Sequence, residues 1–138
     1  MLCVAGGDVC SVSKSGGGPG GVALDLADPA AAGALAEALQ GVDAVVSCVG
    51  FNPFGGDEAM SRAVNGDANA AAAAAAAEAG VKRFVYVSVA SIVRDVVGDA
   101  NLMTGYFEGQ KIAESAGANA FGETAAARVK TSLGYGGD

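Results

Sequence analysis

Three side chains in the second half of the chain could take part in proton transfer: Tyr106, Lys111 and Ser88. A tyrosine phenol has a reference pKa near 10, so at neutral pH it accepts a proton only where a neighbouring cation stabilises the phenolate. Gln110 shares the helix face of Tyr106, whereas Lys111 lies about 100° further round the helix. Lys111 would have to reach back through its flexible stem, or the helix would have to begin irregularly at Gly105. Without such a cation the phenol donates a hydrogen bond but does not accept a proton.

Composition excludes several other kinds of chemistry. The chain has no histidine, which removes Ser-His-Asp triads, histidine general bases and His-ligated zinc. Cys3, Cys10 and Cys48 contain no C-x-x-C pair, so we expect free thiols in a reducing, intracellular compartment and no metal site. The net charge of −7 argues against nucleic acid and anionic membranes as partners. No segment has the ~20 uninterrupted apolar residues of a membrane span.

The elements that position these side chains predict one α/β domain over residues 1–138. Valine-rich apolar runs alternate with helical segments, which indicates a parallel sheet with right-handed crossovers and flanking helices. We expect the last three strands to lie in one parallel sheet. The predicted strands are Asp8–Ser13, Val22–Leu26, Val42–Val49, Lys82–Val89 and Ala125–Leu133, and the predicted helices are Pro29–Gln40 (capped by Asp28), Asp57–Ala79 and Tyr106–Ala116.

The first seven residues allow two interpretations. Leu2–Ala5 has the composition of a strand, but parallel neighbours need about a dozen connecting residues. The two residues Gly6 and Gly7 would therefore permit only an antiparallel hairpin with the strand that begins at Asp8. In the second interpretation, which we favour, Met1–Ala5 is the end of a helix and the first strand is missing. Either way we expect a parallel sheet that is incomplete at its N-terminus.

Six motifs together resemble the atypical short-chain dehydrogenase/reductases. They are similar to a group that includes plant and fungal organellar proteins and is related to the Rossmann-fold accessory subunit of mitochondrial complex I. The resemblance covers about residues 8–138 and implies a Rossmann-like, NAD(P)-binding fold located in a mitochondrion or chloroplast. The motifs are V-S-K-S-G (Val12–Gly16), D-L (Asp25–Leu26), G-V-D-A-V-V-S-C-V-G (Gly41–Gly50), V-N-G-D-A-N (Val64–Asn69), G-V-K-R-F-V-Y-V-S (Gly80–Ser88) and G-Y-F-E-G-Q-K (Gly105–Lys111).

The resemblance implies that strand ends in the first half of the chain bind NADP or NAD. Lys14 corresponds to the position beside the adenosine ribose, where a cation binds the extra phosphate of NADP, so NADP is the expected cofactor. Asp25 would accept a hydrogen bond from the adenine amino group, and Gly50 would permit close approach of the ribose. Each also has a structural alternative, as a solvated lysine, a turn residue and a turn glycine. The implied cofactor-binding residues are Ser13, Lys14, Ser15, Asp25, Leu26, Cys48, Val49 and Gly50.

The resemblance also assigns catalytic roles. In the family a tyrosine transfers the proton, a lysine one helical turn later supports it, and a serine near a strand end holds the substrate oxygen. Tyr106, Lys111 and Ser88 match these positions, with Ser91 as a second candidate for the serine. Ser88 has the structural alternative of a bond to backbone. The Tyr-x-x-x-Lys spacing of the family is broken by one residue here.

Two departures from the family favour a non-catalytic role. A Rossmann domain binds pyrophosphate on a G-x-G-x-x-G turn between its first strand and first helix. Gly16, Gly18 and Gly21 match that pattern but lead into a strand, so we regard the match as spurious. The C-terminal substrate region of the family is also lacking. We therefore expect a nucleotide-binding or structural accessory subunit of a larger complex, with weak cofactor binding; the alternative is an NADP-dependent oxidoreductase that uses Tyr106 on a small carbonyl or alcohol.

Overall fold

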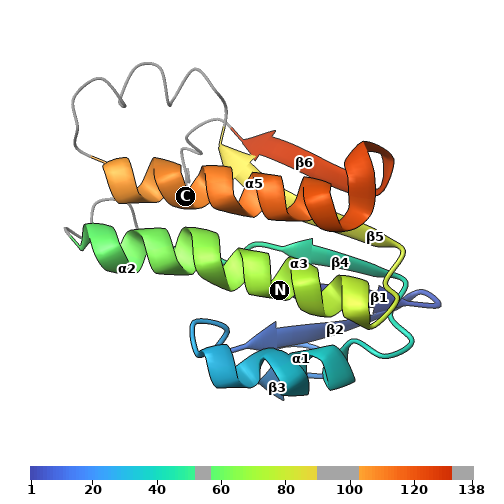
Figure 1. The fold of residues 1–138 in the computed structure, drawn as a ribbon. Coiled ribbons are helices and arrows are strands. Elements are labelled where there is room, and N and C mark those ends of the chain that lie inside the picture. The colour runs from blue at the N-terminus through green and yellow to red at the C-terminus, as the bar shows by residue number, and fades with distance from the viewer. Residues whose placement is uncertain (52–56, 90–102, 132–138) are drawn as a thin grey trace, which may run out of the picture.

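The computed structural model describes residues 1–51, 57–89 and 103–131 (Figure 1). Ser91 and the last residues of the strand predicted as Ala125–Leu133 lie outside these ranges. Within them, no helix is long and apolar enough to span a bilayer. The strands are β1 (Leu2–Ala5), β2 (Asp8–Ser13), β3 (Val22–Ala23), β4 (Ala44–Ser47), β5 (Arg83–Val89) and β6 (Ala126–Thr131), and the helices are η1 (Pro29–Ala31), α1 (Ala32–Ala38), α2 (Glu58–Arg62), the π-helical η2 (Ala63–Asp67), α3 (Ala68–Glu78) and α5 (Thr104–Ala125).

The six strands form one sheet in the order β3-β2-β1-β4-β5-β6. This is the strand order of the dinucleotide-binding fold, so the domain is Rossmann-like. Strands β4, β5 and β6 pair in parallel, which confirms the prediction for the last three strands. Strands β2 and β3 are also parallel, whereas β1 is antiparallel to both of its neighbours, β2 and β4. The central strand therefore runs against the other five.

The favoured interpretation of Met1–Ala5 as the end of a helix is wrong, because Leu2–Ala5 is strand β1. Gly6 and Gly7 both have positive φ, 57° and 94°, as the two central residues of a type I′ hairpin turn require. This tight turn pairs Val4 with Val9 and brings β1 back along β2. The other edge of β1 pairs with β4, so the strand fills the centre of the sheet through contacts distant in sequence.

The helices lie where the sequence predicts them, but their bounds and divisions differ from the predicted ones. Asp28 caps η1 by accepting a hydrogen bond from the Ala30 amide at 2.9 Å. The helix predicted as one element over Asp57–Ala79 is α2, η2 and α3 in succession, and α5 extends beyond the predicted Tyr106–Ala116 at both ends, with a break at Gly122. Strand β3 is shorter than the predicted Val22–Leu26, because only its first two residues pair with β2.

Helices α1, α2, α3 and α5 cover one face of the sheet, as Figure 1 shows. The chain moves in one direction across the sheet from β3 to β6, and right-handed crossovers then place every connecting helix on the same side. The core lies in this layer, where Val45 and Phe84 pack with Leu35, Leu39 and the buried alanines of α3. On the opposite face Val9 and Val129 are 44% and 48% exposed, and no described helix covers them.

A pair of glycines allows the helices of this layer to approach closely. A Cβ atom added to Gly109 of α5 would lie 2.9 Å from the amide nitrogen of Gly66, and one added to Gly66 would lie 2.8 Å from the Cα of Gly109. Such distances are too short for real Cβ atoms, so the two backbones touch here without intervening side chains. This contact sets the rotation and height of α5 over the sheet.

Candidate functional site

A cleft of about 620 Å³ opens at the edge of the sheet where β2, β3 and β4 end. In open α/β sheets, ligands bind outside the carboxyl ends of the strands, and this volume is typical of small-molecule sites. Among the described residues, the cleft wall contains all of the predicted cofactor-binding residues except Ser15, which is exposed. Parallel strands end at a common edge, which explains why three separate motifs meet here. The wall consists of Met1, Val12, Ser13, Lys14, Leu24, Asp25, Leu26, Ala27, Cys48, Val49, Gly50, Phe51, Met60 and Val64.

The charged end of the cleft is an ion pair between two of the predicted residues. Lys14 Nζ lies 2.7 Å from Asp25 Oδ2, and the Lys14 side chain is 81% exposed. The hydrogen bond with its partner raises the pKa of Lys14 and lowers the pKa of Asp25, so both are ionised at neutral pH. Asp25 Oδ1 also accepts a hydrogen bond from the Ala27 amide at 3.2 Å. A phosphate that approaches Lys14 therefore meets the Asp25 carboxylate as well.

Ser13, beside this pair, has an unused hydrogen-bonding group. Within the described ranges, its Oγ is a buried side-chain oxygen without a hydrogen-bond partner. Leaving such a group unsatisfied costs about 1–3 kcal/mol, so native proteins usually supply a partner. Because Ser13 lies in the cleft wall, a ligand hydroxyl or phosphate is a fitting partner.

Two buried asparagines hold the end of β4 in the cleft wall, a role that sequence reasoning missed. Asn69 accepts a hydrogen bond from Ser47 Oγ at 2.5 Å and donates through Nδ2 to the Val49 carbonyl at 3.0 Å. Asn65 Oδ1 accepts from the Phe51 amide at 3.1 Å and lies so close to Gly50 that a Cβ there would be 3.1 Å away. Two asparagines four residues apart in an alanine-rich helix were the available signal. Asn65 lies in the π-helical turn η2, and Asn69 follows it in α3.

Tyr106 and Ser88 meet around Gln110, the residue on the Tyr106 face of α5. Gln110 is only 3% exposed, and its Oε1 accepts hydrogen bonds from Tyr86 Oη at 2.8 Å and Ser88 Oγ at 2.9 Å. Ser88 Oγ also lies 2.7 Å from Glu114 Oε1. Lys111 is exposed on the next face. The structure thus brings Ser88 and Tyr106 to a neutral amide and leaves the lysine in solvent.

The tyrosines of this cluster have perturbed acidity. Burial raises the pKa of Tyr86 far above its ordinary value, and the nearby phenol of Tyr106 and the Glu114 carboxylate raise it further. Burial also raises the pKa of Tyr106, and hydrogen bonding with Gln110 opposes part of that rise. Both phenols are therefore protonated at neutral pH. A protonated phenol at Tyr106 can donate a hydrogen bond to a carbonyl oxygen, but neither phenol accepts a proton from an alcohol.

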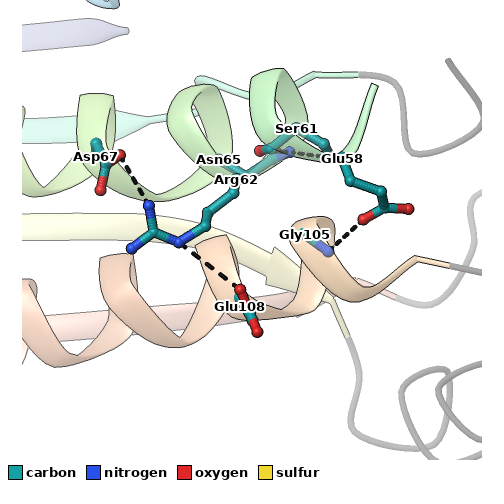
Figure 2. A network of polar contacts seen from close by, with 7 residues as sticks. All are labelled: Glu58, Ser61, Arg62, Asn65, Asp67, Gly105 and Glu108. Atoms are coloured by element: carbon teal, nitrogen blue, oxygen red, sulfur yellow. Dashed lines mark hydrogen bonds and ion pairs between the residues drawn. The ribbon is translucent and has the colours of Figure 1, made fainter. Parts of the chain in front are cut away.

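Contacts between α2 and the first turns of α5 hold this cluster in place (Figure 2). The Glu58 carboxylate accepts a hydrogen bond from the Gly105 amide, at the N-terminal end of α5 where a negative charge is favoured. Arg62 pairs with Glu108 of α5 at 3.7 Å and with Asp67 at 3.5 Å. The two ion pairs are exposed and contribute little stability, so the Glu58 contact and the glycine contact position the helix.

Tyr106, Ser88 and Lys111 are not among the described residues of the cleft wall. The described part of the chain contains no group of acidic and thiol side chains that could hold a metal ion.

Comparison with known proteins identifies a family for most of the chain. A family model described as NAD(P)H-binding matches residues 13–125, a range that begins at the serine with the unused hydroxyl. A search of curated proteins found no match.

Proposed function

Because this chain belongs to the NAD(P)H-binding family, we propose that it is a non-catalytic, nucleotide-binding accessory protein of the atypical short-chain dehydrogenase/reductase type. The observation that carries the proposal is the cleft, which gathers the cofactor-binding residues predicted from three motifs at the carboxyl edge of a Rossmann-like sheet. These residues fit a nicotinamide dinucleotide. Leu24, Leu26 and Val49 offer apolar contact for adenine, and Ser13 and Lys14 offer a hydroxyl and a cation for the ribose and its phosphate.

We propose weak binding, because the pyrophosphate donors of the fold have no counterpart among the described residues at this edge. In a Rossmann domain several backbone amides and a helix N-terminus contact the pyrophosphate. Here a two-residue turn connects β1 to β2, so no crossover helix begins there. Each charge-assisted hydrogen bond contributes about 1.5–3 kcal/mol, so losing two or three of them weakens binding about 10²-fold or more.

NADP is the preferred cofactor in this proposal, and Lys14 carries the preference. A cation at the end of the second strand favours a 2′-phosphate, whereas an acidic residue favours free ribose hydroxyls. This edge of the sheet has both a cation and a carboxylate, with Lys14 Nζ 2.7 Å from Asp25 Oδ2. Lys14 is the more exposed of the two side chains and is free to turn toward a phosphate.

The absence of catalysis in the proposal rests on the tyrosine cluster. Tyr106 has the neutral Gln110 beside it, and its raised pKa keeps the phenol protonated. When bound, the nicotinamide ring would supply or accept a hydride, but neither phenol of the cluster is ionised to act as the base for alcohol oxidation. The alternative, an NADP-dependent oxidoreductase acting on a small carbonyl or alcohol, is favoured by one observation: Tyr106 and Ser88 do converge on one residue.

The proposal also extends to the setting of the protein. The resemblance to organellar proteins and to the complex I accessory subunit supports a mitochondrial or chloroplast location and membership of a larger protein complex. Both follow from the resemblance alone. Co-purification of the tagged protein with a multi-subunit assembly from isolated organelles tests both, and a protein recovered alone from the cytosol contradicts both.

Calorimetric titration with NADPH and NADH tests the core of the proposal. We expect NADPH to bind with a dissociation constant well above micromolar, NADH to bind more weakly, and no oxidation of NADPH with a panel of small aldehydes and ketones. Micromolar NADPH binding contradicts the weak-binding argument. Turnover that is lost in Tyr106→Phe moves the oxidoreductase alternative ahead.

A further inference from the structure

We propose that the cleft recognises the phosphorylated adenosine half of the cofactor by itself. A nucleotide such as adenosine 2′-monophosphate would then bind about as tightly as complete NADP. This inference deepens the proposed function and rests on it, since it concerns the same cleft. The second half of the dinucleotide, which is the diphosphate and the nicotinamide riboside, then adds no affinity.

The reversed central strand removes the usual diphosphate site from the cleft edge. In the dinucleotide-binding fold the diphosphate lies across the carboxyl end of the first strand, on the loop that follows it. Here β1 runs the opposite way, so its amino end, with Met1, lies at the cleft. One N–H of the Met1 ammonium donates to the Val12 carbonyl at 2.9 Å.

The turn that follows β1 lies at the other edge of the sheet and faces other partners. The Gly6 amide donates to Asp43 Oδ2 at 3.2 Å, and Asp43 pairs with Lys82 at 3.0 Å. Asp43 and Lys82 precede β4 and β5, so this cluster marks the amino edge. The glycines that flank β1 are therefore at the edge opposite the cleft and cannot contact a ligand there.

The second glycine segment offers no substitute. The Gly16 amide donates to the Ser13 carbonyl at 3.2 Å, and the Gly17 carbonyl accepts from Ser11 Oγ at 2.6 Å. This segment folds back along the edge of β2, where the Pro19 carbonyl accepts from the Ser11 amide at 2.8 Å. These three polar groups bond to the sheet edge, and strand β3, not a helix, follows the segment.

What the cleft does offer matches the adenosine half. Its polar groups gather at the ends of β2 and β3, where Ser13, Lys14 and Asp25 stand together. The rest of the described wall is mainly apolar and suits the adenine ring. Lys14 is ion-paired with Asp25, so one partly neutralised cation recognises a phosphomonoester on the ribose. The 2′-phosphate therefore determines the selectivity for NADP over NAD.

Titration with four ligands tests the inference: adenosine 2′-monophosphate, adenosine 5′-monophosphate, NADP and NAD. We expect the 2′-monophosphate and NADP to agree within about threefold, and the other two to bind at least about tenfold more weakly. Lys14→Gln should remove the preference for the 2′-phosphate. Lys82→Gln is the matched control, because Lys82 is an equally exposed lysine in an ion pair at the opposite edge, and it should leave all four affinities unchanged.

The outcomes separate this inference from the proposed function. NADP binding more than about thirtyfold tighter than the 2′-monophosphate shows that the diphosphate finds donors here, and it overturns the inference while NADP binding stands. Equal binding of NADP and NAD by the unmodified chain overturns the role of Lys14. Binding of none of the four by a chain whose circular dichroism shows it folded overturns both the inference and the proposed function.

Discussion

At the scale of single residues, Gln110 determines whether the tyrosine cluster can transfer a proton. It occupies the position on the Tyr106 face that a supporting cation would need, and its Oε1 is engaged by Tyr86 and Ser88. Gln110→Lys would restore the Tyr-x-x-x-Lys spacing of the resembled family, but it would place an ammonium group among buried hydroxyls. Burying a charge is costly unless it is paired. The glutamine is therefore part of the packing of this chain as well as a departure from the family pattern.

The two perturbed phenols predict a loss of stability at alkaline pH. In the unfolded chain a tyrosine releases its proton near pH 10, whereas burial keeps Tyr86 and Tyr106 protonated in the folded chain at higher pH. The folded state then binds more protons, so the free energy of unfolding falls as pH rises above about 10. Urea unfolding at pH 9 and pH 10.5 should show a smaller fall for Tyr86→Phe than for the unmodified chain. Identical falls in the two proteins would mean that Tyr86 titrates normally.

At the scale of elements, the glycine contact between η2 and α5 determines which side chains meet. Gly66 and Gly109 let the two helix backbones touch, and this sets the rotation that directs Gln110 toward β5. Gly117, two turns further along α5, has a different role. A Cβ added there would meet Phe84 at an ordinary contact distance of 3.7 Å. Two glycines in one helix thus offer a matched comparison.

Alanine substitution should have opposite effects at these two glycines. Gly109→Ala forces the helices apart and should destabilise the protein by about 1–3 kcal/mol, the usual cost of overpacking. Gly117→Ala gains helix propensity and apolar contact and should stabilise it by about 0.5–1 kcal/mol. Urea denaturation measures both. A neutral Gly109→Ala would show that the helices separate without cost and that the contact does not position α5.

At the scale of the whole molecule, the described ranges form a sheet with helices on one face. A mostly parallel sheet is normally covered on both faces by its crossovers, but two of the connections here are too short to contain helices. The turn at Gly6 and Gly7 and the glycine segment before β3 replace the crossovers that would cover the second face. The register places Val46, Val85 and Ala127 side by side across three strands of that face.

Isosteric substitutions on the two faces should differ sharply in cost. Val45→Thr places a hydroxyl in the fully buried layer under the helices and should cost about 1–3 kcal/mol. Val129→Thr makes the same change at a half-exposed position and should stay within about 0.5 kcal/mol. Valine and threonine are both β-branched, so the substitution leaves strand propensity nearly unchanged. Equal costs by urea denaturation would show that the second face is covered in solution.

The sequence by itself determined what depends on near neighbours. Valine runs, the Asp28 cap and the alanine-rich helix specify strands and helices locally. Because parallel strands share an edge, the residues predicted to bind a cofactor could be expected to cluster. The turn at Gly6 and Gly7 set the direction of β1 relative to β2, but the place of β1 at the centre of the sheet depended on its pairing with β4, about 40 residues away. The ion pair of Lys14 with Asp25 and the contact of Gln110 with Ser88 likewise join distant segments. Only the tertiary structure decided these features, because helix rotation and strand order follow from packing between elements and leave no local pattern.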